Sequence, residues 1–197
     1  MHKQKFFQPM VWVVWIILAT TGLGSNASAD PLSATLQQAR NGHARAQSKL
    51  GNMYLAGEGV QKDYVAAMYW FRQAAEQGDA EAQNGIGTLY DNGKGVPRDF
   101  LEAARWFRLA ARQGHVLARR NLGWMYEKGQ GLPKDYVKSY MWQALAEMAH
   151  HKKAPASAEN HAGMPCRYCA SVARHMTREH MEQAQQMARA WQPSTSQ

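Results

Sequence analysis

The chain has 197 residues, of which 45% are hydrophobic and 19% are charged, and its formal net charge is +8 at pH 7. This length suits a single domain. The basic residues are spread along the chain and form no dense block, so we expect the positive charge mainly to maintain solubility.

The N-terminus has the three parts of a secretory signal peptide. Lys3 and Lys5 precede an apolar stretch, and small residues at Ala27 and Ala29 mark a cleavage site. The apolar stretch is short for a membrane span, although an uncleaved anchor is the alternative. We therefore expect a periplasmic protein that begins at Asp30. Its formal charge falls to +6, because cleavage removes the two lysines and no carboxylate.

A unit of 36 residues is then repeated three times. Turn glycines, a helix glycine, a tyrosine, an aspartate and a tryptophan return at this spacing. They are Gly57/Gly59, Gly93/Gly95 and Gly129/Gly131; Gly51, Gly87 and Gly123; Tyr54, Tyr90 and Tyr126; Asp63, Asp99 and Asp135; and Trp70, Trp106 and Trp142. A fixed period of this size predicts a solenoid, in which stacked units bury faces that one unit cannot bury alone.

Each copy is predicted to form two helices, a first helix A and a second helix B. In the first copy, Ala46, Leu50 and Tyr54 share one face of a helix A over 44–55. Gly51 lies within this helix, where glycine lowers helix stability by about 1 kcal/mol relative to alanine. We expect its missing Cβ to allow the close approach of a neighbouring helix.

The connection between the two helices carries a Gly-x-Gly pair, and one of its glycines should adopt the left-handed conformation. Asp63 and its equivalents should accept hydrogen bonds from the first turn of helix B. In the second copy, Glu102 has the spacing to complete a capping box with Asp99. Within helix B, Trp70 is predicted to be the large side chain that fills the space between helices.

Capping segments are expected at both ends of such a stack. Thr177 is a candidate N-cap for a closing helix with an apolar stripe. The predicted organisation is a signal peptide at 1–29, an N-terminal capping half-repeat at 30–41, repeats at 42–77, 78–113 and 114–149, an irregular Cys/His-containing insertion at 150–172, a C-terminal capping helix at 173–192 and a disordered tail at 193–197.

The repeated pattern resembles the Sel1-like repeat, a relative of the tetratricopeptide repeat. The first copy carries Ala44, Ala46, Gln47, Leu50, Gly51, Tyr54, Gly57, Gly59, Val60, Asp63, Ala67, Trp70, Ala74, Ala75 and Gly78 of it. The third copy departs at Arg119, Ser139 and Glu147, so its helix B is expected to pack less regularly. The resemblance implies an all-α, right-handed α/α superhelix that holds other proteins, without implying one partner.

The segment after the repeats contains both cysteines, Cys166 and Cys169, and three interpretations of them stay open. An even pair in an exported chain favours a local disulfide. Together with His175 and His180 the pair would offer zinc ligands, but at a spacing shorter than that of common zinc fingers. A redox-active pair is the third interpretation, although the scaffold of thioredoxin-like proteins is absent. We expect neither a metal ion nor another cofactor.

Motifs of metalloproteases, P-loop proteins and α/β-hydrolases do not occur in the sequence, so no enzyme activity is expected. Haem attachment is excluded because Ala170, and not histidine, follows Cys169. Some cysteine-rich relatives of the Sel1-like family bind or hydrolyse β-lactams, but they carry a cysteine pair in every repeat. This chain has no cysteine within its repeats. The alternatives to a binding scaffold are an envelope redox or metal-dependent factor that uses Cys166 and Cys169, and a β-lactam-interacting relative.

The favoured function is an envelope scaffold that binds a partner protein or peptide on its concave face. Nucleic acid is not an expected partner, the membrane would be contacted only through an uncleaved signal peptide, and the oligomeric state is open. The contacts are expected at exposed, non-repeating positions of the A helices: Arg45, Lys49, Asn52, Glu81, Asn84, Thr88, Leu117, Arg120 and Asn121. The alternative is that these side chains are only solvated.

Overall fold

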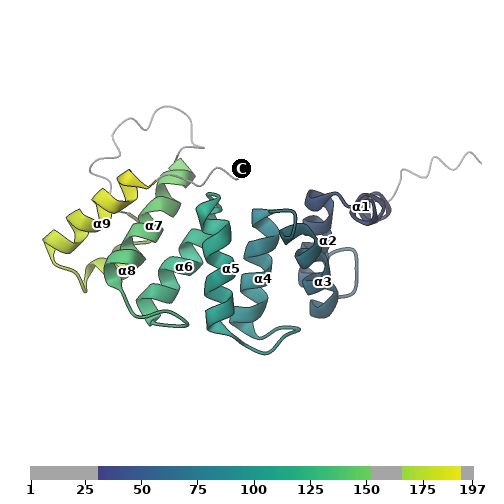
Figure 1. Cartoon of the computed structure of the whole chain (residues 1–197), viewed down its shortest axis with the longest axis horizontal. Helices are drawn as coiled ribbons and strands as arrows, with labels where there is room; N and C mark the ends of the chain where they lie inside the picture. Colours follow the sequence, from purple (N-terminus) through teal and green to yellow (C-terminus); the bar gives the residue numbers. More distant parts are fainter. Residues whose placement is uncertain (1–30, 152–165, 192–197) are drawn as a thin grey trace, which may run out of the picture. The chain divides into compact units, whose positions relative to one another are not determined.

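The computed structural model describes residues 31–151 and 166–191. These residues form nine helices and no strand, and the helices follow one another in a row in chain order (Figure 1). The helices are α1 (Pro31–Arg40), α2 (Ala44–Ala56), α3 (Tyr64–Ala75), α4 (Ala80–Asn92), α5 (Phe100–Arg112), α6 (Val116–Lys128), α7 (Tyr136–His151), α8 (Ala170–Ala173) and α9 (Arg178–Ala190). None of them is both long and apolar enough to span a membrane. The predicted signal peptide, most of the predicted insertion and the predicted tail lie outside the described residues.

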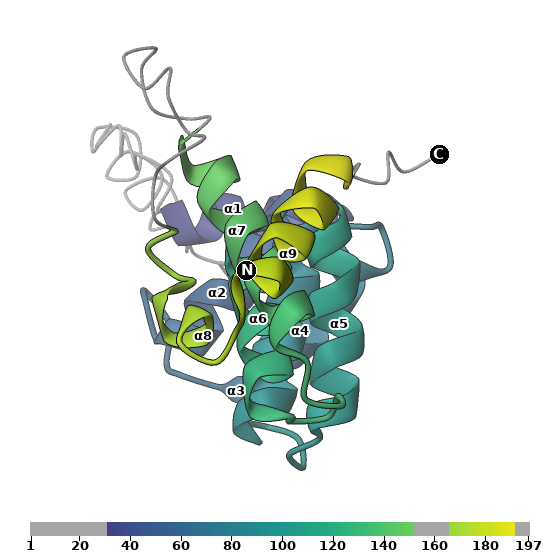
Figure 2. The same cartoon turned by 90° about the vertical axis from the view of Figure 1, so that its left-hand side faces the viewer.

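Six of the helices form three pairs, each with an A helix followed by a B helix: α2 with α3, α4 with α5, and α6 with α7. Successive pairs also touch, because α3 packs on α4 and α5 packs on α6. At one end α1 packs on α2, and at the other end α8 and α9 pack on α7 (Figure 2). The prediction of an all-α solenoid is confirmed.

Phenylalanines fill the space between the helices of the first two repeats. Phe71 and Phe107 are almost completely buried, whereas Trp70 and Trp106 are partly exposed. Trp70 and Trp106 still pack against buried residues of neighbouring helices, so tryptophan contributes to this packing, but phenylalanine is the fully buried aromatic residue. In the third copy Trp142 is buried, because Trp191 of the closing segment covers it edge-on at 5.8 Å between ring centroids.

The helix glycines provide the room for these phenylalanine rings. A Cβ built on Gly51 would lie 2.5 Å from the ring of Phe71, and one on Gly87 would lie 2.7 Å from that of Phe107. Gly85 faces Phe71 from the other side, since its Cβ would lie 2.7 Å from the same ring. The expected close approach at Gly51 is confirmed, and the group that approaches is an aromatic ring of helix B.

The third repeat has a polar interior at the same positions. Gln143 stands where the first two copies have Phe71 and Phe107, and Ser139 stands where they have alanine. Both side chains are buried, and Gln143 Nε2 donates to Ser139 Oγ at 3.1 Å. Helix α7 is continuous through these residues, so the departure affects the packing and leaves the helix intact.

A glutamine pair links the start of helix A to the end of helix B in each of the first two repeats, and an arginine replaces it in the third. Gln77 Nε2 donates to Gln47 Oε1 at 2.8 Å, and Gln113 Nε2 donates to Gln83 Oε1 at 2.9 Å. Arg119 occupies the equivalent position in the third repeat, where it donates to the carbonyl oxygens of Ala111 and Leu145. Its guanidinium also lies 4.6 Å from the centre of the Trp191 ring. The substitution therefore attaches the closing segment to the last repeat.

The predicted aspartate caps are present at the start of every B helix. Asp63 Oδ1 accepts from the N–H groups of Val65 and Ala66, and Asp99 and Asp135 cap α5 and α7 in the same way. The residues Gly57 and Gly59, of which one was expected to be left-handed, both have positive φ.

The predicted capping box is wrong. In a capping box the carboxylate of Glu102 would accept a hydrogen bond from the backbone N–H of Asp99. This N–H donates instead to the carbonyl oxygen of Tyr90 at 3.1 Å. Glu102 pairs with Arg105 one turn further along α5. The long-range bond to Tyr90 ties the end of the connection back to helix A, and it thereby removes the donor that a capping box requires.

Candidate functional site

Helices α2, α4 and α6 carry equivalent non-framework positions on one side of each helix, and we call this side the A face. Three of these positions, Ser48, Asn84 and Gly85, are buried. Within one helix these positions are spaced at i, i+3, i+4 and i+7, so they share one side of the helix. In the three repeats they are Arg45, Glu81 and Leu117; Ser48, Asn84 and Arg120; Lys49, Gly85 and Asn121; and Asn52, Thr88 and Trp124. All nine predicted contact residues belong to this set, and Trp124 is the large side chain that the prediction missed. Its distance of 36 residues from Thr88 could have identified it.

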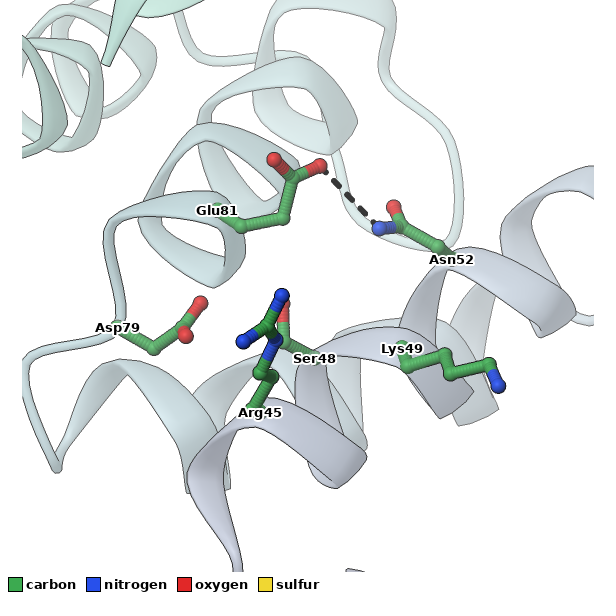
Figure 3. Close-up of a pocket in the computed structure, with 6 residues that line it drawn as sticks. All are labelled: Arg45, Ser48, Lys49, Asn52, Asp79 and Glu81. Atoms are coloured by element: carbon green, nitrogen blue, oxygen red, sulfur yellow. Dashed lines mark hydrogen bonds between the residues drawn. The ribbon is translucent and has the colours of Figure 1, made fainter. Parts of the chain in front are cut away.

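An open pocket with a volume of about 400 Å³ lies between α2 and α4 on the A face (Figure 3). Four predicted contact residues line it together with one serine and one aspartate: Arg45, Lys49, Asn52, Glu81, Ser48 and Asp79. The structure thus brings the predicted residues of the first repeat together with Glu81 of the second.

Both carboxylate oxygens of Glu81 and one of Asp79 accept hydrogen bonds within the protein. Glu81 Oε1 accepts from Asn52 Nδ2 at 3.2 Å, and Glu81 Oε2 accepts from His115 Nε2 at 2.9 Å. The hydrogen bond from His115 lowers the pKa of the Glu81 carboxyl, although partial burial opposes this shift. Asp79 is the N-cap of α4, and its Oδ1 accepts from the N–H of Ala82 at 2.8 Å.

His115 connects this pocket to the next repeat. Its Nδ1 accepts from the N–H of Ala118 at 3.2 Å and so caps helix α6. Because Nδ1 is the acceptor, the proton of the neutral ring lies on Nε2, which donates to Glu81. One imidazole therefore caps α6 and holds the carboxylate of α4.

The two cations of the pocket have unoccupied donors. Arg45 and Lys49 are exposed, and neither makes a hydrogen bond or an ion pair with any residue that the structure describes. The guanidinium of Arg45 extends into the pocket, whereas Lys49 points away from Glu81 (Figure 3). The pocket thus offers more free hydrogen-bond donors than free acceptors.

In the middle of the A face, α4 and α6 are in contact through Asn84 and Asn121. Asn84 is only 8% exposed, so the prediction of an exposed contact residue is wrong at this position. Asn121 Nδ2 donates to Asn84 Oδ1 at 3.4 Å, and Thr88 Oγ1 donates to the Asn84 carbonyl oxygen at 2.9 Å. Asn84 points toward α6 and links the second repeat to the third.

The third repeat presents an apolar end of the A face. Leu117 and Trp124 are 49% and 43% exposed. Beside them the guanidinium of Arg120 lies 4.5 Å from the centre of the Tyr168 ring. Tyr168 comes from the segment after the repeats, so this segment extends the A face beyond α6.

A disulfide joins Cys166 and Cys169, whose Cα atoms are 5.1 Å apart. Cys169 is buried, and its sulfur lies 3.8 Å from the carbonyl oxygen of Tyr140 in α7. The loop that carries Tyr168 is thus attached to the last B helix.

The two histidines of the candidate zinc site lie elsewhere on the surface. His175 stacks on the ring of Tyr136 at 5.0 Å, and His180 lies in the first turn of α9. Among the described residues no three histidine, cysteine or carboxylate side chains gather as metal ligands. The bonded sulfurs of Cys166 and Cys169 are not thiolates and could not serve as such ligands.

The family model of the Sel1 repeat matches residues 44–79, 80–115 and 116–149. The chain belongs to the Sel1 repeat family. The matched repeats begin two residues after the predicted boundaries at 42, 78 and 114. Each Sel1 repeat therefore begins at helix A itself.

Two solved structures with Sel1 repeats are similar to this chain. The first is c5321, a protective antigen present in uropathogenic Escherichia coli strains, with an SLR fold; it is 38% identical, with a TM-score of 0.55 over 57% of this chain and 24% of its own. The second is a Sel1 repeat protein from Oxalobacter formigenes, 32% identical, with a TM-score of 0.52 over 62% of this chain and 48% of its own. This chain thus spans about a quarter and about half of the two proteins. No curated protein matches it.

Sel1 repeat proteins generally mediate interactions between proteins, and their repeat is a scaffold fold without a catalytic group of its own. The framework residues that define the family in this chain build helices, turns and caps. Between the repeats of this chain, the A-face side chains vary while this framework is kept.

Proposed function

We propose that this protein is a periplasmic interaction scaffold that binds a segment of another envelope protein on its A face. The observation that carries the proposal is the change of chemistry along equivalent positions. Where the first repeat has Arg45, the second has Glu81 and the third has Leu117. Extended repeat surfaces of this kind bind partners through side chains that vary over a constant framework.

The apolar end of the A face supports the same proposal. Leu117 and Trp124 lie on one side of α6 and both are exposed, so their apolar surfaces can form one patch, and contiguous apolar patches commonly mark interaction sites. Tryptophan and arginine are also the residues that most often dominate the energy of an interface. Trp124 and Arg120 are both on this face.

Photo-crosslinking in the native host tests which face binds. A crosslinking amino acid at Lys49 or Trp124 samples the A face, and one at Val65 or Leu101 samples exposed apolar positions of the B helices. We expect one protein to be crosslinked from both A-face positions and not from Val65 or Leu101. Crosslinks only from Val65 or Leu101 would show that the B helices form the binding surface. The absence of crosslinks from all four positions would refute the scaffold.

A charge reversal provides a second test of the same face. In a pull-down from the periplasm, Arg45→Glu combined with Arg120→Glu should abolish recovery of the crosslinked partner. Arg112→Glu is the matched control, because Arg112 is an exposed arginine of a B helix. Equal recovery with all variants would count against the A face.

The periplasmic location is tested separately. The proposal rests on the signal-peptide pattern of residues 1–29, and a disulfide is compatible with an oxidising compartment. We expect a C-terminally tagged chain to appear in the periplasmic fraction with Asp30 as its first residue by mass spectrometry. Recovery of the full-length chain from the cytoplasm would refute this location.

A redox function of the cysteine pair has less support. A redox-active C-x-x-C pair is typical of a thioredoxin-like scaffold that contains strands, whereas the described residues around the partly exposed Cys166 and the buried Cys169 are helices and turns. A Cys166→Ser/Cys169→Ser variant should therefore retain partner binding, and loss of binding with intact folding would favour the redox alternative.

A further inference from the structure

We infer that the A face binds an extended peptide at two points. A carboxylate of the peptide enters the pocket of the first repeat, and an apolar side chain of the peptide, about six peptide residues further along, packs on Leu117 and Trp124 of the third repeat. This inference rests on the proposed function and adds the chemistry of the partner. It depends on which polar groups of the A face are engaged and which are not.

The pocket selects a hydrogen-bond acceptor. Both carboxylate oxygens of Glu81 accept bonds from side chains of this protein. Arg45 and Lys49 have no such partner among the described residues, and they lie one helical turn apart on α2. A carboxylate can accept two parallel N–H bonds from the Arg45 guanidinium. Lys49 can add a third after its flexible side chain turns toward the pocket, since it points away in Figure 3.

The charge of the pocket favours a single carboxylate over a polyanion. Arg45 and Lys49 are balanced by Asp79 and Glu81 in the same pocket, so the local net charge is close to zero. A balanced pocket exerts little long-range attraction on an extended polyanion. Its free donors still recognise one acceptor group at short range. We therefore assign an aspartate, a glutamate or a C-terminal carboxylate of a peptide to this pocket.

The third repeat supplies the second contact. Leu117 and Trp124 are seven residues apart on α6, so they lie on one side of the helix, two turns apart. Arg120 lies between them in sequence and stacks on Tyr168, so its charge is placed over an aromatic ring. This arrangement leaves an apolar surface that an aliphatic or aromatic side chain of the partner can cover.

The separation of the two contacts follows from the repeat. Side-chain hydrogen bonds join α2 to α4 (Asn52 to Glu81) and α4 to α6 (Asn121 to Asn84). Helices in contact lie about 10 Å apart, so α2 and α6 are separated by roughly 20 Å. An extended peptide advances about 3.3 Å per residue. About six residues therefore span the two contacts, and the polar Glu81 and Thr88 of α4 lie under the middle of the segment.

Selection of peptides from a displayed library of random 12-residue sequences on the full chain tests this inference. We expect enrichment of sequences with aspartate or glutamate five to seven residues from leucine, phenylalanine or tryptophan. For a selected peptide, Arg45→Ala with Lys49→Ala should weaken binding by about tenfold or more, since a charge-assisted hydrogen bond contributes on this scale. Trp124→Ala should weaken binding to a similar extent, while the control variants Arg112→Ala and Val65→Ala should not.

A change in the peptide separates recognition from folding. Replacing the acidic residue of the selected peptide by its amide should weaken binding to the unaltered protein and have no further effect on the Arg45→Ala/Lys49→Ala variant. Selected peptides without a carboxylate, or equal competition by polyglutamate, would overturn the two-point recognition. If the A-face positions crosslink a partner but the selected peptides lack a carboxylate, the scaffold function is supported and only the proposed carboxylate recognition is refuted.

Discussion

At the scale of single residues, the contact between glycine and phenylalanine organises each of the first two repeats. Gly51 and Gly85 lie on opposite sides of the Phe71 ring, at distances that no Cβ could keep. The ring thus holds the A helices of two successive repeats at the same separation from one B helix. This is a physical reason for glycine inside a helix, where it otherwise lowers stability.

Gly51→Ala should destabilise the protein by about 1 to 3 kcal/mol, as overpacking of a core typically does. The gain in helix propensity is smaller than the strain, because the added Cβ meets the Phe71 ring at 2.5 Å. Thermal or urea unfolding measures the change. Combining Gly51→Ala with Phe71→Leu should cost less than the sum of the two single changes, and simple additivity would contradict the proposed clash.

At the scale of helices, capping and long-range hydrogen bonds position the A and B helices. Asp63, Asp99 and Asp135 begin the three B helices, and His115 begins α6 while it holds Glu81 of α4. Asn84 and Asn121 join the same two A helices further along. Polar side chains between the A helices therefore maintain the spacing of the helices that carry the A face.

Asp99→Ala should lower the free energy of unfolding by about 1 kcal/mol, because its carboxylate caps two N–H groups of α5. Asp99→Asn keeps an acceptor and should lose less. Glu102→Ala should have a small effect, since Glu102 makes no capping box. Chemical denaturation compares the three variants, and an equal loss for Asp99→Ala and Glu102→Ala would contradict this assignment.

The bond between Glu81 and His115 should make stability depend on pH in the acid range. The pKa of Glu81 is lowered in the folded protein, first because His115 donates a hydrogen bond to it. The resulting stabilisation is therefore present above the ordinary pKa of a glutamate, about 4.3. It is lost as the pH falls through the lowered pKa of the folded state. Thermal unfolding from pH 7 to 3 should show a shallower decline for Glu81→Gln than for the wild type, and parallel curves would refute the contribution.

At the scale of the whole molecule, stability is a sum of contacts between neighbouring repeats, so each end of the stack needs a cover. Helix α9 covers α7 with Ala184 and Ala188, both buried, and Arg119 and Trp142 contact Trp191 at its end. The polar interior around Gln143 lies in the same last repeat. The C-terminal end therefore combines a buried polar contact with an apolar cluster that the closing helix covers.

Ala184→Glu should strongly destabilise this end, because it places a charge in the interface between α7 and α9. Gln183→Glu is the matched control, since Gln183 is the exposed neighbour on the same helix. Hydrogen exchange should show lost protection in α6, α7 and α9 before α2 and α3. Uniform loss over all repeats would contradict stability by nearest-neighbour contacts.

The sequence alone predicted the number of repeats, the paired helices and the capping aspartates. These features depend on local patterns: the 36-residue period, the spacing of apolar residues within one helix, and side chains that bond to their own helix ends. The same period places the nine predicted contact residues at equivalent positions of the A helices, of which Asn84 is buried.

Only the tertiary structure decided which of these positions is exposed and which aromatic residue is buried. Trp70 and Phe71 are adjacent in helix B, and the choice between them depends on where Gly51 and Gly85 of the neighbouring helices leave room. Asn84 is buried because α6 approaches it, and Glu102 makes no capping box because Tyr90 accepts the bond that the box requires. Each of these outcomes depends on a partner distant in sequence, and the periodicity of a single helix carries no information about such a partner.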